Sequence, residues 1–392
     1  MQSILSEDIE LVFEYYSDFC YKKLLRSLTK PLAWKRNGGV LKLFGKKADP
    51  VIGLDIGSTS VRLLQLSSHG SGYRVDHFAI EPLGEGAVVD KVVQDVEAVS
   101  NAISRAVKAS GTRAKSCAIA VSGSAVFTKT ISLPADLADA DIESQVQIEA
   151  NQYVPYPLNE VSLDFEVLGP SPRNPDMVDI LLAASKSENV ESRQDAIDTA
   201  GLKAKVVDVE AFAIANAFEL IRTRDNVKKD EAIGFFDIGY DLSTLLVIKG
   251  NRVIYTRDHP FGGHQLLEET QRRYDMTVEQ ASFFERDEDG PEDFEEEVLE
   301  PFQMNIVHQI SRALQFYASS NEYSSISTIY LSGGVASLKG LVEIVQQELG
   351  VTTRAADPVT GMDIAQNVAA TAIKRNSSSL MIAMGLALRG FD

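Results

Sequence analysis

The sequence is poor in several features that mark particular classes of protein. Its two cysteines, Cys20 and Cys117, are too few for a disulfide framework and have no metal-ligand spacing, and such rarity is typical of a reducing compartment. No stretch reaches the roughly 18 uninterrupted apolar residues of a membrane span, and the N-terminus lacks the apolar core and cleavage site of a secretory signal. These absences predict a cytoplasmic protein that meets a membrane only through partners.

Positive charge is also scarce. The chain has 38 Lys and Arg against 56 Asp and Glu, a net charge of −18, which argues against general binding to nucleic acid. It has 392 residues, of which 44% are apolar and only 13 are proline, so it can form several packed units and is too apolar for disorder. We therefore expect a globular α/β protein that does not bind nucleic acid.

The first 48 residues differ from the rest in charge. They hold nine Lys and Arg against five Asp and Glu, whereas the remainder carries 29 − 51 = −22. Apolar residues between Ser6 and Leu28 have helical spacing, which predicts a basic N-terminal extension with an added docking helix. The alternative is that residues 1–39 are not native sequence, and we hypothesise that translation starts at Val40, because GTG encodes valine and can initiate.

From Pro50 onward, apolar runs alternate with amphipathic stretches, the pattern of α/β architecture. Strands are expected at Val51–Asp55, Val61–Leu66, Ser116–Val121, Val178–Ala184, Ala204–Asp208, Ala232–Asp237, Ser243–Lys249, Arg252–Asp258 and Thr328–Ser332. Helices are expected at Asp90–Ala109, Ala138–Gln152, Asn189–Ala200, Ala211–Arg222, Phe261–Tyr274, Thr277–Glu285, Pro301–Ser319, Gly340–Glu348 and Ser379–Leu388.

The chain contains an internal duplication. Residues 54–64 and 236–246 superpose at a constant offset of 182, which aligns an Asp-Ile-Gly triplet and two leucines. Each copy reads as a buried strand, a short polar turn and a second apolar strand, so each half of the molecule should contain one such β-hairpin. Asp-containing turns close many ordinary hairpins, but two at matching positions favour two halves that face each other across a ligand.

The chemistry of these turns suits a nucleotide. Gly57 and Gly239 let the backbone approach an anion, and turn amides and the hydroxyls of residues 58–60 can donate to phosphate oxygens. Asp55 and Asp237 would repel a triphosphate unless a divalent cation lay between them, so they imply Mg²⁺ held partly through water.

A third element follows later in the chain. Residues 328–336 form a buried strand that runs into Gly333-Gly334 ahead of a helix, where glycines can admit the flat face of a nucleoside. Gly262-Gly263 also precedes a helix and could close the base side of the cleft. A tight strand-to-helix turn remains the alternative explanation of the first of these pairs.

These three motifs in this order resemble those of the actin-like ATPase superfamily. The dinucleotide fingerprint Gly-x-Gly-x-x-Gly and the Walker A lysine are absent from the loops, which argues against Rossmann enzymes and P-loop NTPases. The resemblance implies ATP and Mg²⁺ as ligands. The nucleotide-binding residues it implies are Asp55, Gly57, Ser58, Thr59, Ser60, Arg62, Asp237, Gly239, Asp241, Ser243, Gly262, Gly263, Gly333 and Gly334.

Within that superfamily, residues 122–131, 149–158 and 163–169 resemble the PilM family of type IV pilus assembly. The resemblance implies an actin-like fold of two duplicated lobes around a nucleotide cleft, with an FtsA-like subdomain 1C in place of actin's subdomain 1B. It also implies capture of the N-terminal cytoplasmic peptide of the inner-membrane protein PilN at the cytoplasmic face of the inner membrane. PilO and PilP would be reached indirectly, and PilC and the pilus motor ATPases are further candidate partners.

Rigid apolar surface for an extended peptide is expected from one short stretch, because aromatic and proline side chains lose little entropy on binding. This stretch is Tyr153, Val154, Pro155, Tyr156 and Pro157. The two prolines also predict that the preceding helix stops here.

The resemblance further implies four subdomains after the extension of residues 1–48. Subdomain 1A would comprise residues 49–133 and 209–229, subdomain 1C residues 134–208, subdomain 2A residues 230–258 and 325–392, and subdomain 2B residues 259–324.

We identify no residue that would position or activate a water molecule, so ATP hydrolysis is expected to be slow or absent. The alternatives are an FtsA-like cell-division filament protein, a related cytoplasmic component of type II secretion, and a sugar or acid kinase. FtsA-like proteins carry an amphipathic membrane helix at the C-terminus. Residues 380–388 are instead nearly all apolar and predict a buried helix packed near the first hairpin.

Overall fold

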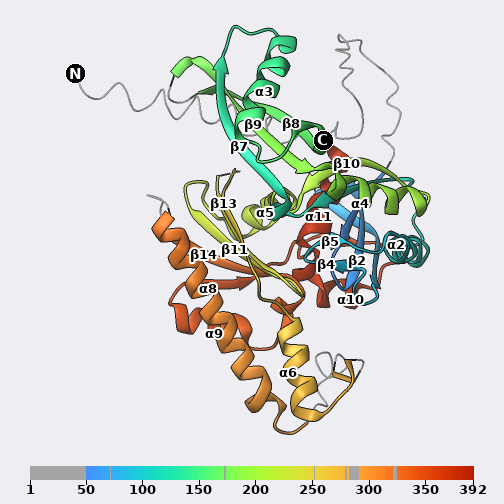
Figure 1. The fold of residues 1–392 in the computed structure, drawn as a ribbon. Coiled ribbons are helices and arrows are strands. Elements are labelled where there is room, and N and C mark those ends of the chain that lie inside the picture. The colour runs from blue at the N-terminus through green and yellow to red at the C-terminus, as the bar shows by residue number, and fades with distance from the viewer. Residues whose placement is uncertain are drawn as a thin grey trace.

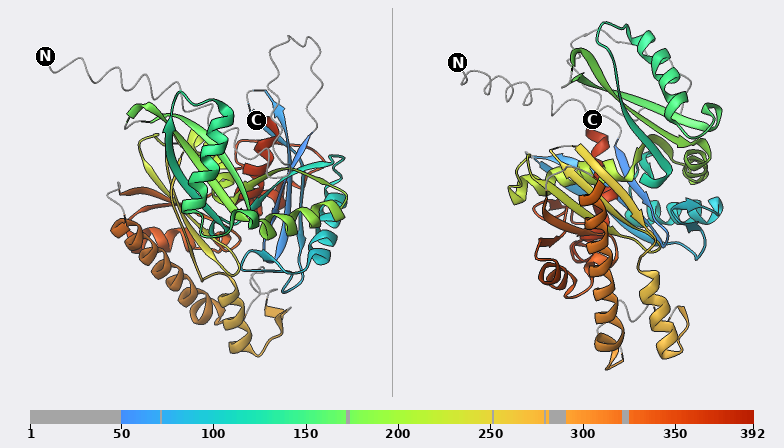
Figure 2. Two further views of the ribbon diagram at one scale, coloured as in Figure 1. Left: turned by 45° about the horizontal axis from the view of Figure 1, so that its top comes forward. Right: turned by 60° about the vertical axis from the view of Figure 1, so that its left-hand side comes forward.

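The computed structural model describes residues 50–392, except residues 71, 172–173, 251, 279, 282–290 and 321–324. The predicted N-terminal extension and the Val40 start therefore lie outside the described residues, as does the end of the helix predicted at Thr277–Glu285. Figure 1 shows two large sheets side by side and a smaller sheet above them, and Figure 2 shows that the small sheet projects from the rest.

The first large sheet has six strands in the order β10-β6-β1-β2-β3-β16. They are β10 (Lys203–Val209), β6 (Ser116–Val121), β1 (Val51–Ile56), β2 (Ser60–His69), β3 (Gly72–Pro82) and β16 (Asp363–Ile364). The helices packed in this lobe are α2 (Val96–Ser110), α4 (Ser187–Thr199), α5 (Glu210–Asp225), α10 (Ala370–Arg375) and α11 (Met381–Leu388). Strand β1 is buried along its whole length, so the hairpin that β1 forms with β2 starts in the core.

The second large sheet has five strands in the order β13-β12-β11-β14-β15. They are β13 (Arg252–His259), β12 (Ser243–Lys249), β11 (Ala232–Ile238), β14 (Ile326–Ser332) and β15 (Thr352–Ala355). The helices of this lobe are α6 (His264–Tyr274), α8 (Glu300–Ser320) and α9 (Leu341–Leu349). Figure 1 shows α6 and α8 side by side at the end of the molecule opposite the small sheet.

The two large sheets repeat one another strand by strand. In both, a central strand pairs antiparallel with the next strand along the chain and parallel with a later one. The offset of 182 also holds for the register, because Ile56 lies opposite Val61 and Ile238 lies opposite Ser243. The predicted duplication and the paired hairpins are therefore confirmed.

A third sheet of three strands forms the small projection. It consists of β7 (Val126–Pro134), β9 (Asn174–Lys186) and β8 (Val161–Ser171) in that order, with α3 (Asp139–Tyr153) packed on it around a separate apolar core. This sheet begins at Val126, whereas subdomain 1C was expected to start at residue 134. The predicted range of subdomain 1C, residues 134–208, also includes most of β10, which belongs to the six-stranded sheet. The subdomain division stays a prediction.

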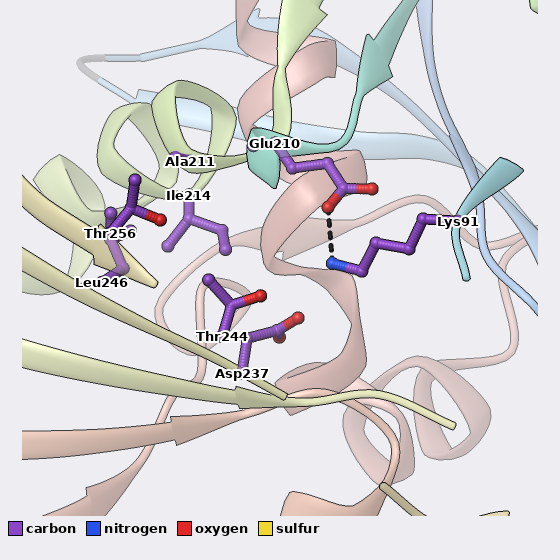
Figure 3. Close-up of a pocket in the computed structure, with 9 residues that line it drawn as sticks. Lys91, Glu210, Ala211, Ile214, Asp237, Thr244, Leu246 and Thr256 are labelled. Atoms are coloured by element: carbon purple, nitrogen blue, oxygen red, sulfur yellow. Dashed lines mark hydrogen bonds and ion pairs between the residues drawn. The ribbon is translucent and has the colours of Figure 1, made fainter. Parts of the chain in front are cut away.

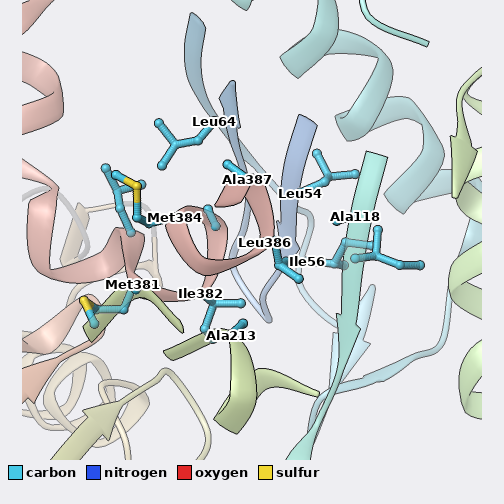
Figure 4. Close-up of a cluster of buried hydrophobic side chains, with 14 of the residues drawn as sticks. Leu54, Ile56, Leu64, Ala118, Ala213, Met381, Ile382, Met384, Leu386 and Ala387 are labelled. Atoms are coloured by element: carbon cyan, nitrogen blue, oxygen red, sulfur yellow. The ribbon is translucent and has the colours of Figure 1, made fainter. Parts of the chain in front are cut away.

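The C-terminal helix is the centre of the larger core. All residues of α11 are buried, and Figure 4 shows them packed among side chains of β1, β2, β6 and α5. The packing is close: a Cβ on Gly53 of β1 would lie 2.1 Å from the carbonyl oxygen of Ala383, and one on Gly385 would lie 1.8 Å from that of Ala213. The prediction of a buried helix beside the first hairpin is therefore confirmed.

Two local predictions were wrong or incomplete. The helix expected from Asp90 begins only at Val96, after the N-cap Asp95, because the symmetric stretch Val-Val-Asp-Lys-Val-Val folds as a hairpin of β4 (Val88–Val89) and β5 (Val92–Val93). The strands β3, β7 and β8 were not predicted. Most of their residues are partly or fully exposed, so apolar and polar residues do not alternate regularly along them. Within the described part of the chain, no helix is long and apolar enough to cross a membrane.

Candidate functional site

The two duplicated hairpins close with the same turn. The amide of Gly57 donates to the carbonyl oxygen of Ser60 at 3.0 Å, and the amide of Gly239 donates to that of Leu242, also at 3.0 Å. Ser58 is partly exposed and Thr59 exposed in the first turn, and Asp241 is partly exposed in the second. Both turns thus present polar groups at the ends of buried strands, as an anion site requires.

Each hairpin places one aspartate in the interior. Asp55 is 5% exposed, and its carboxylate accepts a hydrogen bond from Arg62 across the hairpin at 2.9 Å. Asp237 is 8% exposed and accepts one from the Ser332 hydroxyl at 2.8 Å, so the second hairpin is tied to the strand that leads into Gly333-Gly334.

A buried ion pair completes the site, and the sequence did not point to it. Lys91, at the tip of the β4–β5 hairpin, donates to Glu210, the first residue of α5, with 2.6 Å between Nζ and Oε2. Figure 3 shows this pair facing the same space as Asp237 and Thr244 of the second large sheet. The side chains are 16% and 11% exposed, so water screens the pair weakly.

The pKa values reflect this concentration of charge. Burial raises the pKa of Asp55, partly offset by Arg62, and Glu210 and Asp237 raise it further. Burial also raises the pKa of Asp237, against the lowering effect of Lys91 and of the Ser332 hydrogen bond. Burial alone would lower the pKa of Lys91, but Glu210, Asp237 and Asp258 outweigh it and raise the pKa above its usual value. The site is therefore a group of buried carboxylates around two cations, Arg62 and Lys91.

The Gly262-Gly263 turn packs against the second hairpin. The amides of Gly263 and His264 donate to the carbonyl oxygens of Gly239 and Tyr240 at 2.9 and 3.0 Å. A Cβ on Gly262 would lie 2.1 Å from the Tyr240 oxygen, so this glycine permits the close approach. The turn thus supports the loop, and its predicted direct contact with nucleotide stays a prediction.

Ser243 begins β12, and its nucleotide-binding role stays a prediction. Its side chain is fully buried, and its hydroxyl donates to the carbonyl oxygen of Phe261 at 2.7 Å. This hydrogen bond fastens β12 to the residue that precedes the Gly262-Gly263 turn.

The adjacent glycines of the third motif have different surroundings. Gly333 has φ = 91°, and a Cβ there would lie 2.2 Å from the Ile238 carbonyl oxygen, so the backbone itself requires glycine. Gly334 has an ordinary helical backbone, and a Cβ there would meet nothing within 4 Å. Space beside the motif is therefore open at Gly334.

A cavity of about 270 Å³, part of it open to solvent, lies between the lobes. It is lined by Lys91, Gly123, Glu210, Ala211, Ile214, Asp237, Thr244, Leu246 and Thr256. Of the residues predicted to bind nucleotide, only Asp237 lines it, and the glycine pairs lie outside its lining. The assignment of this cavity to a bound nucleotide therefore stays a prediction.

The donor set fits a magnesium-bound phosphate group. In the described part of the chain, no group of three or more His, Cys, Asp or Glu side chains could hold a metal alone. Mg²⁺ keeps several waters and is commonly held by one or two carboxylates together with substrate phosphates. Asp55 and Asp237 could take that role, and Arg62 and Lys91, which are paired with Asp55 and Glu210, could supply positive charge for phosphate oxygens.

The stretch predicted to bind a partner lies at the end of α3. The helix ends at Tyr153, and Pro155 follows, so the predicted helix stop is confirmed. Tyr153 and Tyr156 are each 42% exposed, and Pro155 and Pro157 are exposed, but Val154 is 7% exposed and belongs to the core of the small sheet. This corrects the expectation that all five side chains present surface.

Both exposed tyrosines are paired with lysines of the small sheet. The Lys129 ammonium of β7 lies 5.1 Å from the centre of the Tyr153 ring, and that of Lys186 in β9 lies 4.8 Å from the centre of the Tyr156 ring. Cation–π pairs at exposed sites commonly contribute about 0.5–1 kcal/mol, which favours these ring positions. The surface therefore combines aromatic groups with positive charge.

A second crevice lies under the small sheet. It encloses about 450 Å³, part of it solvent, and is lined by Gly123, Val126, Thr128, Leu181, Val209, Ala211, Phe212, Val253 and Thr256. Gly123, Ala211 and Thr256 also line the cavity that holds Lys91 and Asp237. The two hollows are therefore neighbours that share one wall.

Lys91 and Glu210 are the site residues that sequence reasoning missed. Glu210 directly follows a strand and opens a helix, a position at which α/β proteins gather functional groups, and this signal was available. Lys91 lies within the helix predicted at Asp90–Ala109, so nothing in the sequence placed it at the tip of a hairpin.

Residues 53–391 match the family model described as "Type IV pilus assembly protein PilM". A solved structure described as "PilM-PilN type IV pilus biogenesis complex" is similar over 87% of this chain and 98% of that chain, with 25% sequence identity and a TM-score of 0.73. The ethanolamine utilization protein EutJ from Carboxydothermus hydrogenoformans is similar over 97% and 98%, with 15% identity and a TM-score of 0.52. The last likeness shows the fold alone, and the fold is that of the actin-like ATPases.

Proposed function

The chain belongs to the type IV pilus assembly protein PilM family, and on this premise we propose that it is an adaptor that binds ATP with Mg²⁺ and captures the N-terminal peptide of PilN. A role in type IV pilus assembly follows from the family. The observation that carries the nucleotide part is the pair of hairpins with matching register, which place Asp55 and Asp237 in one electrostatic cluster.

The residues of this cluster have separate tasks in the proposal. Asp55 and Asp237 orient the waters of a magnesium ion, while Arg62 holds Asp55 in place across its hairpin. The turns at residues 57–60 and 239–242 present amides and hydroxyls to phosphate oxygens, and Gly334 leaves room for the nucleoside. Bound Mg²⁺–ATP would supply the divalent cation and the negative charge that join the two lobes.

The peptide part rests on the small sheet. Its strands run in the order β7-β9-β8, so β7 and β8 form its edges in the described structure. An edge strand can pair with an extended peptide, and nearby apolar surface can take its side chains. Tyr153 and Tyr156 supply such surface beside β7 and β9. The solved complex of PilM with PilN supports PilN as the partner.

Coupling between the two ligands is part of the proposal. The cavity with Lys91 and Asp237 and the crevice under the small sheet share Gly123, Ala211 and Thr256. The crevice is also lined by Val126 and Thr128 of the edge strand β7, so a ligand that moves the shared wall can shift the edge proposed to pair with the peptide. Nucleotide can then alter peptide affinity if it binds the open and closed arrangements differently. Hydrolysis is not required for this effect, and we propose that it is slow or absent.

In this proposal, the protein lies at the cytoplasmic face of the inner membrane and is held there through PilN. PilO and PilP are reached through PilN, and PilC and the motor ATPases remain candidate partners. The helix α11 is buried against β1, so α11 itself is not the amphipathic membrane helix of an FtsA-like protein.

Replacing Tyr153 tests the peptide site. We expect Tyr153→Ala to weaken binding of a peptide that copies the PilN N-terminus by about tenfold, because an aromatic anchor commonly contributes 1 kcal/mol or more. ATP affinity should stay unchanged. Calorimetric titration of both ligands measures the difference.

Phe316→Ala is the matched control. Phe316 is 41% exposed on α8 in the other lobe, and Arg257 lies 4.2 Å from the centre of its ring, so it resembles Tyr153 in exposure and in its cation partner. This variant should bind the peptide like the wild type. An unchanged peptide dissociation constant in a folded Tyr153→Ala variant would contradict the proposed site.

A further inference from the structure

The hairpin that carries Lys91 has a strained turn. Asp90 and Lys91 are the two central residues between β4 and β5, and both have left-handed backbones, with φ of 48° and 61°. Aspartate is common at the first central position of such turns, whereas the second is usually glycine because other side chains crowd the backbone there, so the strain lies at Lys91. Strain of this kind persists only where the surrounding structure holds it, and it gathers at functional sites.

A buried arginine holds this turn. Arg193 of α4 is 1% exposed, and its Nη2 donates to the carbonyl oxygen of Lys91 at 2.5 Å, while Nη1 donates to that of Asn189 at 3.2 Å. Its Nε has no hydrogen-bond partner in the described structure. A buried guanidinium that donates to two carbonyl oxygens and has no carboxylate among these partners costs free energy, and one of these hydrogen bonds fixes the backbone of Lys91.

The side chain of Lys91 enters a strongly anionic space. Among the described residues that line the cavity, Lys91 is the cation, and Glu210 and Asp237 are the carboxylates. Asp258 and Asp55 add further negative charge nearby. A phosphate that entered this cavity would be repelled unless it met Lys91, and the ammonium group carries three donors, so it can bind Glu210 and a phosphate oxygen together.

We propose that Lys91 contacts the terminal phosphate of a bound nucleoside triphosphate and that Arg193 positions it, so that this hairpin distinguishes a triphosphate from a diphosphate. The inference rests on the proposed nucleotide binding. Glu210 keeps the ammonium group aimed into the cavity, and α4 connects the turn to β9 of the small sheet, since β9 ends at Lys186 and α4 begins at Ser187.

The test compares two ligands. Calorimetry on Lys91→Met should show that affinity for the non-hydrolysable triphosphate AMPPNP with Mg²⁺ falls at least about tenfold more than affinity for ADP with Mg²⁺, since a hydrogen bond to a charged group commonly contributes that much. Lys91→Arg should keep most of the preference. Lys108→Met, at an exposed position in the last turn of α2, is the control and should change neither affinity.

Arg193 needs a readout that a purely structural role would not move. Arg193→Met, or the milder Arg193→Lys if the first does not fold, should lower the preference for triphosphate when Lys91 is present. The Arg193 substitution should not lower the preference for triphosphate further in a chain that already carries Lys91→Met, because a positioning residue acts only through the residue that it positions.

The outcomes separate the two proposals. If the wild-type protein binds neither nucleotide, the proposed function fails, and this inference fails with it. If the wild type prefers the triphosphate and Lys91→Met weakens both ligands equally or neither, nucleotide binding stands and the role of Lys91 is overturned.

Discussion

The two neighbouring glycines of the third motif offer a clean perturbation of the nucleotide site. The protein requires Gly333, whose φ is 91° and whose Cβ would collide with the Ile238 backbone. It does not require Gly334, where a Cβ would meet nothing within 4 Å and the backbone is helical. In our account, the absence of a side chain at Gly334 leaves room for the nucleoside of bound ATP.

Gly334→Ala should therefore separate stability from binding. Alanine fits the local backbone and restricts the unfolded chain, so the free energy of unfolding should rise by about 0.4–1 kcal/mol. A methyl group placed against a packed nucleoside should cost about 1–3 kcal/mol of binding, which lowers ATP affinity by roughly 5-fold to 150-fold.

Thermal unfolding without ligand and calorimetric titration with Mg²⁺–ATP measure the two effects. Gly333→Ala is the comparison, and it should destabilise the fold because the added atom would lie 2.2 Å from a carbonyl oxygen. If Gly334→Ala folds and binds ATP like the wild type, the nucleoside does not lie against this glycine and the assignment of the motif is refuted.

Two further predictions concern the framework of the site. Gly385→Val should lower the free energy of unfolding by about 3 kcal/mol or more, because a Cβ there would lie 1.8 Å from the Ala213 oxygen, whereas Gly84→Ala has open space and should be nearly neutral in urea unfolding. Burial raises the pKa of Glu166 from 4.5 to about 7, with Arg389 opposing and Asp164 and Asp392 adding to the shift. The folded state therefore retains a proton that the unfolded state releases, so stability should fall as the pH rises from 4.5 to 7. Glu166→Gln should flatten this part of the profile, and an unchanged slope would contradict the assignment.

The sequence predicted the parts of the fold that repeat or that are uniformly buried. The offset of 182 located both hairpins because each begins with a buried strand and an Asp-x-Gly turn, and the structure reproduces even their register. The apolar run at residues 381–388 could be assigned to the core for the same reason. Local pattern was sufficient at these positions.

The rest depended on contacts between distant segments. Lys91 meets Glu210 across 119 residues, and Ser243 meets Phe261 only because two turns pack together, so neither partner could be inferred from local pattern. Val154 is a further example. Its neighbours in the sequence are exposed, but its side chain packs in the core between the three-stranded sheet and α3.

The central claim is that nucleotide and peptide bind to one coupled molecule. Titration of the PilN N-terminal peptide into the purified protein, with and without Mg²⁺–ATP, tests it most directly. Our account predicts binding in both conditions, with a dissociation constant that changes when nucleotide is present. Equal peptide affinity in the two conditions, with ATP shown to be bound, would contradict the coupling, and no peptide binding in either condition would contradict the adaptor role itself.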